Sequence, residues 1–305
     1  MSKFPIKNEK ALAHILMIFL VFCWGFDYVP AKWALEMMSP SAVAFYKYAI
    51  GLACVLIIKI ATGNKNLVRK KDIPIIILCA AFGQALYFEC EYNAMEYMPV
   101  APITIILSFV PIVSVVIERL IYKRRANARI VIGIIICIIG VGLVIGADLS
   151  IIFQGRGIGY LLAIGAVLSW NIYNFITASL DEYDGLTLSM TQMICTTLIL
   201  IPLAMPSMPS PAEFDMRIIL GLLWIGLFDS GFGYLILVYG LQKLGPTTSA
   251  LYSNFLPVTT AFFGVLFLGE TLTPLQIIGG IVVIAAGFIV IKEKGRLDEE
   301  RLKDV

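Results

Sequence analysis

Three apolar stretches of this sequence contain acidic residues, whose side chains can bind a cation or carry a proton. Glu89 and Glu91 lie within residues 73–97, Asp27 lies within residues 12–35, and Asp229 lies within residues 217–241. A carboxylate at the centre of a bilayer costs roughly 2.5 to 3.5 kcal/mol, so it normally faces a protein interior or a wet cavity. We therefore expect these acids to act in binding or proton transfer, since several buried carboxylates are hard to explain by packing.

Helical spacing groups the acids with aromatic and amide side chains, because residues three, four and seven apart share a helix face. The predicted substrate-binding residues on these faces are Trp24, Asp27, Tyr28, Glu89, Tyr92, Trp170, Tyr173, Asn174, Asp229 and Tyr252. Glu89 and Glu91 differ by about 200° around a helix, so at most one of them faces a common cavity unless the helix is broken there.

The charged residues on these faces predict the charge of the solute. Glu89, Glu91 and Asp229 are the candidates for proton coupling, and Lys47, the one deeply placed basic residue, is the expected charge partner. The excess of acids predicts a cationic solute, which the aromatic faces would attract by about 0.5 to 2 kcal/mol through cation–π contacts. In the alternative interpretation, Lys47 neutralises one carboxylate and the aromatic residues are core or interfacial side chains.

The composition identifies a polytopic membrane protein. Of the 305 residues, 59% are apolar and only 14% are charged, against about 25% charged in soluble proteins, and the mean hydropathy is +0.90. A net charge of +2 with no basic stripe disfavours nucleic-acid binding. The six cysteines lie in apolar stretches without CxxC spacing, so we expect no disulfide, metal site or cofactor.

Apolar runs of about 20 residues are long enough to cross a bilayer as helices. Ten such spans are predicted, at residues 12–35, 40–61, 73–97, 101–122, 128–147, 157–180, 187–204, 217–241, 247–268 and 274–292. Lysine and arginine in short connections favour the cytoplasmic side. They gather before the first span, after the second and after the fourth. We therefore predict a multi-pass protein of the cytoplasmic membrane with both termini in the cytoplasm.

The chain contains an internal repeat. A shift of 146 residues places Trp24 on Trp170, Pro111 on Pro257, Phe109 on Phe255 and Gly133 on Gly279. Each half holds five spans, and an odd number means that the halves have opposite orientation, as in many secondary transporters. The predicted organisation is an all-α fold of two inverted five-helix repeats, residues 1–147 and 148–292, followed by a charged tail at residues 293–305.

Two stretches resemble a known family. Residues 244–291, LGPTTSALYSNFLPVTTAFFGVLFLGETLTPLQIIGGIVVIAAGFIVI, are similar to the second repeat of EamA-type proteins in the drug/metabolite transporter superfamily. The stretch CWGFDYVPAKWAL, and residues 39–49 with Lys47 where such proteins often carry arginine, resemble the first repeat. The resemblance implies a basket of two repeats around a cavity lined mainly by spans one, three, four, six, eight and nine. The chain departs from the pattern where Arg124 occupies the position that matches Glu270.

The resemblance implies transport, since family members move amino acids, amines, drugs and other metabolites, and the acids indicate which solute. We predict alternating-access transport of a small organic cation or amine, by facilitation or proton coupling. Two alternatives are an amino acid whose carboxylate binds Lys47 and the efflux of bulky lipophilic cations. An intramembrane enzyme is disfavoured because the sequence lacks GxGD and HExxH motifs. The expected partners are a cationic or zwitterionic small molecule and the lipid bilayer, with no nucleic acid, and the assembly is a monomer or homodimer.

Overall fold

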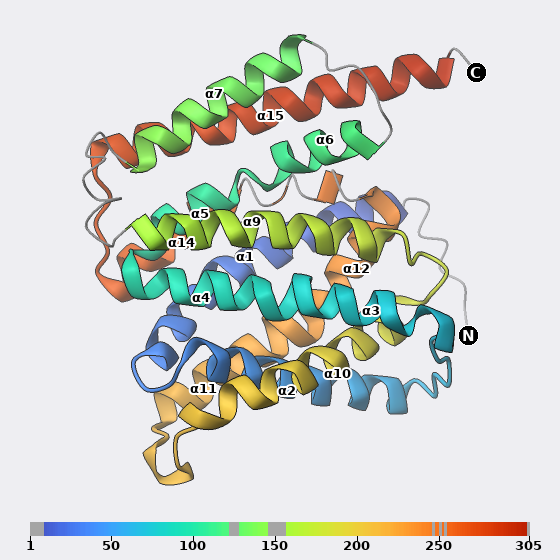
Figure 1. Ribbon diagram of the computed structural model, residues 1–305, viewed down its shortest axis with the longest axis vertical. Coiled ribbons are helices and arrows are strands. Elements are labelled where there is room, and N and C mark those ends of the chain that lie inside the picture. Colours follow the sequence, from blue (N-terminus) through green and yellow to red (C-terminus); the bar gives the residue numbers. More distant parts are fainter. Residues whose placement is uncertain are drawn as a thin grey trace.

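The described chain folds into helices joined by turns and short connections (Figure 1). The computed structural model describes residues 9–121, 128–145, 157–245, 248–249, 252 and 255–303, and contains no strand within them. The helices are α1 (Glu9–Leu35), α2 (Pro40–Ala61), α3 (Ile73–Ala80), α4 (Tyr87–Tyr97), α5 (Val100–Leu107), α6 (Val110–Ile121), α7 (Ala128–Ile145), α9 (Gly157–Ala178), α10 (Gly185–Ala204), α11 (Met216–Trp224), α12 (Phe232–Leu244), α14 (Leu256–Phe263) and α15 (Pro274–Lys303).

The described helices confirm the predicted all-α polytopic fold. Within the described residues, seven helical spans are long and apolar enough to cross a membrane, and Ala128–Gly140, Leu256–Leu268 and Pro274–Val290 form three shorter apolar helices. Several boundaries have a local cause. The Ser39 hydroxyl accepts a hydrogen bond from the Ala42 amide at the start of α2, where Pro40 follows, and α12 ends at Gly245, whose φ of 79° suits glycine.

Spans three and eight are each interrupted by a π-helical segment. Segment η2 (Ala81–Leu86) joins α3 to α4, and segment η5 (Ile225–Gly231) joins α11 to α12. A shift of 146 residues brings η2 onto η5, so the interruption recurs in both halves. π-helical turns change the helical register and are frequent at functional sites.

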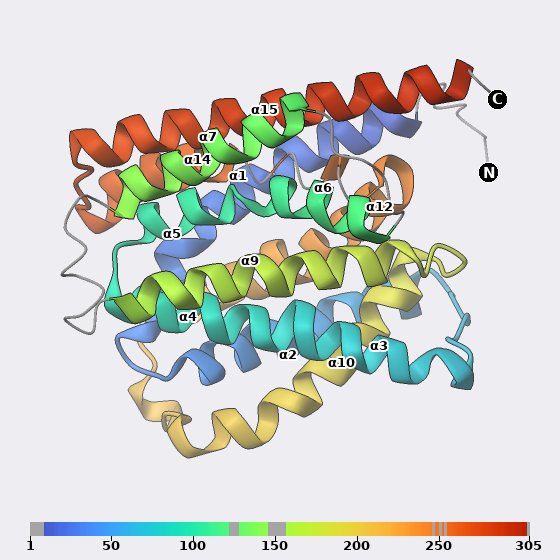
Figure 2. The same ribbon diagram turned by 45° about the horizontal axis from the view of Figure 1, so that its top comes forward.

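The helix contacts follow the repeat as well. The α4 helix packs on α9, and the related pair, α1 and α12, also packs together. The α2 helix packs on α10, while α7 and α15 lie side by side along one edge of the molecule (Figures 1 and 2). The α1 and α9 helices, which begin the two halves, run in opposite directions (Figure 2).

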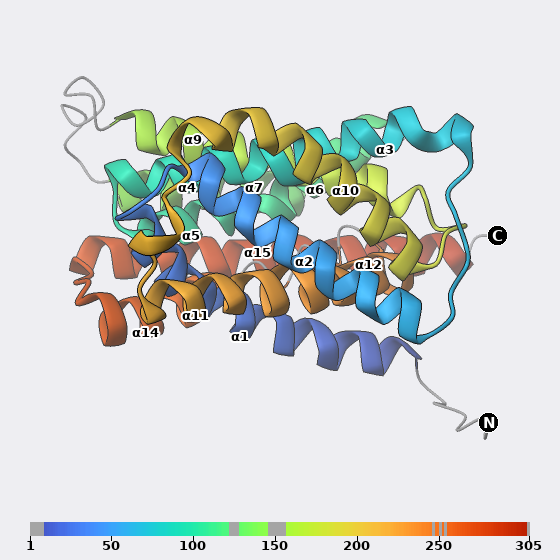
Figure 3. The ribbon, with the colours of Figure 1, turned by 90° about the horizontal axis from the view of Figure 1, so that it is seen from below.

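One end of the molecule gathers the predicted cytoplasmic features that the structure describes. The start of α1, the connection between α2 and α3, and the end of α15 lie there (Figure 3). We call it the basic end, because the α2–α3 connection carries Lys65, Arg69, Lys70 and Lys71. The first eight residues, Arg124 and its neighbours, and the predicted repeat boundary after residue 147 lie outside the described residues.

Candidate functional site

A buried cavity lies between the two halves of the fold. It is lined by Trp24, Asp27, Tyr28, Tyr87, Phe88, Glu91, Leu107, Val110, Trp170, Asp229, Tyr234 and Leu256. These residues come from spans one, three, four, six, eight and nine, which are the spans that the family resemblance implies. The cavity volume is about 30 Å³, enough for one or two waters. An organic solute therefore needs some of these side chains to move.

Lys47, on α2, joins two acids beside this cavity. Its side chain is fully buried, its Nζ lies 3.6 Å from Asp27 Oδ2, and it forms an ion pair with Asp229 on η5. The ammonium also donates to the Tyr92 hydroxyl at 3.3 Å and lies 3.4 Å from the centre of the Phe88 ring. We refer to Asp27, Lys47 and Asp229 as the ionic triad.

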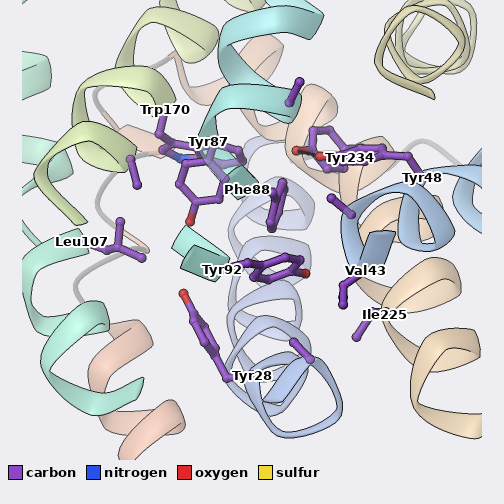
Figure 4. Close-up of a cluster of buried hydrophobic side chains, with 14 of the residues drawn as sticks. Tyr28, Val43, Tyr48, Tyr87, Phe88, Tyr92, Leu107, Trp170, Ile225 and Tyr234 are labelled. Carbon is purple, nitrogen blue, oxygen red and sulfur yellow. Dashed lines mark hydrogen bonds between the residues drawn. The ribbon is translucent and has the colours of Figure 1, made fainter. Parts of the chain in front are cut away.

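Glu91, on α4, is the third buried acid. Its Oε1 accepts hydrogen bonds from the hydroxyl of Tyr28 at 2.5 Å and from that of Tyr87 at 2.6 Å. The two tyrosines come from α1 and α4, and their hydroxyls point toward one another (Figure 4). Glu91 is only 3% exposed, so its charge is held by these two donors rather than by solvent.

The charges at this site do not balance. Asp27, Asp229 and Glu91 face the single ammonium of Lys47 among the described residues that line or contact the cavity. An uncompensated charge inside a protein is costly, so a proton or a bound cation stabilises this arrangement. Trp24 Nε1 and Asp27 Oδ1 are buried and have no hydrogen-bond partner within the described part of the chain, leaving one donor and one acceptor for a ligand.

An aromatic layer separates the acids from the basic end. It consists of Trp24, Tyr48, Tyr87, Trp170, Tyr173 and Tyr234. The Trp170 ring centroid lies 4.7 Å from that of Tyr87 and 5.8 Å from that of Trp24, and the hydroxyls of Tyr48 and Tyr234 are 2.6 Å apart (Figure 4). Because α1 starts at the basic end, Trp24 lies nearer that end than Asp27. The layer therefore lies between the acids and the basic end.

Some of the predicted site residues line the cavity and others do not. Those that line the cavity are Trp24, Asp27, Tyr28, Glu91, Trp170 and Asp229. Tyr92 reaches Lys47 instead, and Tyr173 stacks on Trp170 with ring centroids 5.2 Å apart. The ammonium of Lys47, the predicted charge partner, pairs with Asp229 and lies 3.6 Å from Asp27 Oδ2.

Glu89, Asn174 and Tyr252 do not line the cavity. Glu89 lies on another face of α4 from Glu91, where its Oε2 accepts a hydrogen bond from Asn93 at 3.3 Å. Tyr252 instead bonds His14 near the start of α1. The angle between Glu89 and Glu91 around the helix separates them, and the structure puts Glu91 in the cavity.

Sequence reasoning missed several aromatic residues of the site, notably Tyr87, Phe88 and Tyr234. Tyr87 lies four residues before Glu91, so helical spacing could have identified it. Tyr234 lies five residues after Asp229, beyond the π-helical segment η5, where regular helical spacing no longer predicts which side chains share a face. Among the described residues, no group of three or more histidine, cysteine or acidic side chains could hold a metal ion.

In the comparison with known proteins, the same family model matches both halves of the chain. The model of the EamA-like transporter family matches residues 11–146 and again residues 157–292. An uncharacterized transporter of Archaeoglobus fulgidus is 25% identical over 281 residues, covering 92% of this chain and 99% of the relative.

Two other relatives have more specific names. A probable amino-acid metabolite efflux pump of Salmonella typhimurium is 25% identical, covering 90% of this chain and 93% of the relative. A probable terminal-alkyne amino-acid exporter of Streptantibioticus cattleyicolor is 22% identical, covering 73% and 74%. Among the solved structures that are similar, one matches with a TM-score of 0.68 at 16% identity, covering 92% of this chain and 97% of that chain, which shows a common fold.

Proposed function

The chain belongs to the EamA-like transporter family, and from that premise we propose that it carries a small organic cation across the cytoplasmic membrane. It is a membrane transporter rather than an enzyme. The proposed solute is an amine or a quaternary ammonium ion, moved by alternating access and coupled to protons. The proposed orientation puts the basic end in the cytoplasm, since lysine and arginine favour that side.

The observation that carries the proposal is the charge of the site. The site holds three buried carboxylates, of which Asp27 and Asp229 contact its one ammonium, so its charges favour a cationic solute over an anionic one. Asp27 Oδ1, which is buried without a hydrogen-bond partner in the described chain, offers such a solute an acceptor.

The walls of the cavity support the same solute class. Trp24, Tyr28, Tyr87 and Trp170 line it beside the acids, and aromatic faces attract ammonium groups, more strongly when water is excluded.

Binding to purified protein is the first test. Methylammonium, tetramethylammonium, choline and neutral amino acids are compared in thermal unfolding at two pH values. A ligand at 100 times its dissociation constant stabilises the folded state by about 2.7 kcal/mol, which raises the melting temperature measurably. We expect members of the cation set to raise it.

Glu91→Gln and Glu89→Gln form a matched pair of variants for the same assay and for uptake into proteoliposomes. Both remove one carboxylate from α4, but only Glu91 lines the cavity. We expect Glu91→Gln to weaken cation binding and uptake at least tenfold, and Glu89→Gln to behave as the wild type. Equal effects of the two substitutions, or a response to amino acids alone, would refute the proposal.

An amino acid is the second candidate, favoured by the names of the Salmonella typhimurium and Streptantibioticus cattleyicolor relatives. In that case an acid binds the amino group and Lys47 binds the carboxylate. The contacts of Lys47 oppose this, because its ammonium is fully buried and already lies between Asp27 and Asp229. The binding panel separates the two candidates directly.

A further inference from the structure

Lys47 has the surroundings that a bound cation would require. Its ammonium lies between the carboxylates of Asp27 and Asp229, over the Phe88 ring at 3.4 Å, and 3.3 Å from the Tyr92 hydroxyl. Two anions, an aromatic face and a hydroxyl acceptor are the groups that recognise an ammonium ion. The side chain is fully buried, so no solvent shares in this binding.

The charged and titratable groups that face Lys47 come from three of the elements that pack on α2, namely α1, α4 and η5. Asp27 faces it from α1, Asp229 from η5 and Tyr92 from α4, and the Glu91 carboxylate acts on it electrostatically from α4. Its neighbour on α2, Tyr48, turns instead to the hydroxyl of Tyr234. The ionic triad thus borders the cavity through Asp27 and Asp229, both of which line it.

We propose that Lys47 is a tethered competitor of the transported cation, and that it couples transport to protons. In the empty transporter its ammonium occupies the carboxylates of the ionic triad. When a cation binds them, the Lys47 ammonium becomes an uncharged amine and its proton leaves to the water on the side to which the site is open. This rests on the proposed function, of which it gives the coupling step.

The charges balance in this step. One positive charge enters with a monovalent cation and one leaves as a proton, so the charge of the site is unchanged. On the other side of the membrane, a proton returns to the amine and the restored ammonium displaces the cation. The result is a one-for-one exchange of cation for proton.

The identity of residue 47 allows a direct test. A buried lysine can release its proton, whereas arginine stays protonated in proteins. Lys47→Arg therefore keeps the positive charge but prevents the exchange, while Lys47→Met removes both the charge and the proton. The double variant Asp27→Asn/Lys47→Met keeps the formal charge of the triad. It replaces the single Lys47→Met variant in the experiment if that variant does not fold.

The experiment measures proton release when cations bind to purified protein in weakly buffered detergent solution, followed with a pH-indicator dye. The probes are methylammonium, tetramethylammonium and choline. For the wild type we expect one proton released per cation bound, and an affinity that rises about tenfold for each pH unit while lysine is protonated. We expect Lys47→Arg to bind at least tenfold more weakly. Lys47→Met, or the double variant, should bind without proton release and with no such dependence on pH.

Three outcomes would overturn the inference. Cation binding to the wild type without proton release, or the same proton release from Lys47→Arg as from the wild type, refutes it and leaves the proposed function standing. Binding of none of the three cations refutes the proposed function and the inference together.

Discussion

Asp184 joins the two halves of the chain at the basic end, and its substitution should cost more than that of an ordinary helix cap. Its Oδ1 accepts hydrogen bonds from the Thr187 amide at 2.9 Å, at the start of α10, and from the Asn64 side chain at 3.0 Å. Its Oδ2 accepts one from the Asn66 side chain at 3.0 Å. Asn64 and Asn66 belong to the α2–α3 connection, so two of these three bonds cross between the halves.

Asp215 provides the matched control, because it caps α11 through one bond from the Ile218 amide at 2.8 Å. Loss of a helix cap costs about 1 kcal/mol, and each further hydrogen bond contributes about 0.5 to 1.5 kcal/mol. The Asn66 bond is exposed, so the lower part of that range applies to it. We therefore expect Asp184→Ala to lower the free energy of unfolding by about 2 to 3 kcal/mol and Asp215→Ala by about 1 kcal/mol.

Thermal unfolding in detergent measures this difference. A dye that fluoresces on reaction with thiols suits the protein, because its six free cysteines are all buried or half-buried. At about 2 to 4 °C for each kcal/mol, Asp184→Ala should melt several degrees below Asp215→Ala. Equal melting temperatures would show that the bonds from Asn64 and Asn66 contribute nothing to stability, and would refute the argument.

Three further predictions follow from single contacts. Burial alone would raise the pKa of Asp184, but its hydrogen bonds outweigh burial and hold this pKa below its ordinary value. Its charge thus stabilises the fold above about pH 4, and the stability difference between wild type and Asp184→Asn should vanish as the pH falls through the lowered pKa. A methyl group at Gly83 would overlap the Tyr173 ring, so Gly83→Ala should cost about 1 to 3 kcal/mol in thermal unfolding; an unchanged melting temperature would contradict this packing. Tyr48→Phe leaves the buried Tyr234 hydroxyl without its partner and should cost about 1 to 3 kcal/mol, whereas Tyr48→Phe/Tyr234→Phe should recover much of it; a double variant no more stable than the single one would argue against the bond.

The sequence predicted the helices well because each span is a long apolar run, and its limits are marked by prolines, glycines or charges. The predicted span of residues 40–61 and the α2 helix, Pro40–Ala61, have the same ends. It predicted the candidate site less completely, because helical spacing relates residues on one helix and says little about which residues meet across helices. The contacts of Lys47 with Asp27 and Asp229 join three spans that are far apart in the sequence.

The sequence also does not reveal how each helix is rotated about its own axis, which decides the side chains that point inward. Spacing alone left Glu89 and Glu91 open, and the packing of α4 against α9 and α2 decides which of them points inward. The π-helical segments add to this difficulty, since no pattern of apolar residues marks a change of register within a span. Tyr234 follows such a segment and was missed for that reason.

The repeat itself shows why the fold does not specify the chemistry. A shift of 146 residues relates Asp27 to Tyr173, Lys47 to Met193, and Asp229 to Gly83. At one of the two positions that the repeat relates, Asp27 and Lys47 of the first half meet Asp229 of the second. At the other position, Tyr173 of the second half packs directly against Gly83 of the first, and the Tyr173 hydroxyl lies 3.4 Å from Gln192 Oε1. The repeat thus relates two positions between the halves, of which one carries charge and the other is filled by an aromatic ring. We therefore expect the proposed cation to bind at the charged position, because the related position has no acid and is already filled by the Tyr173 ring.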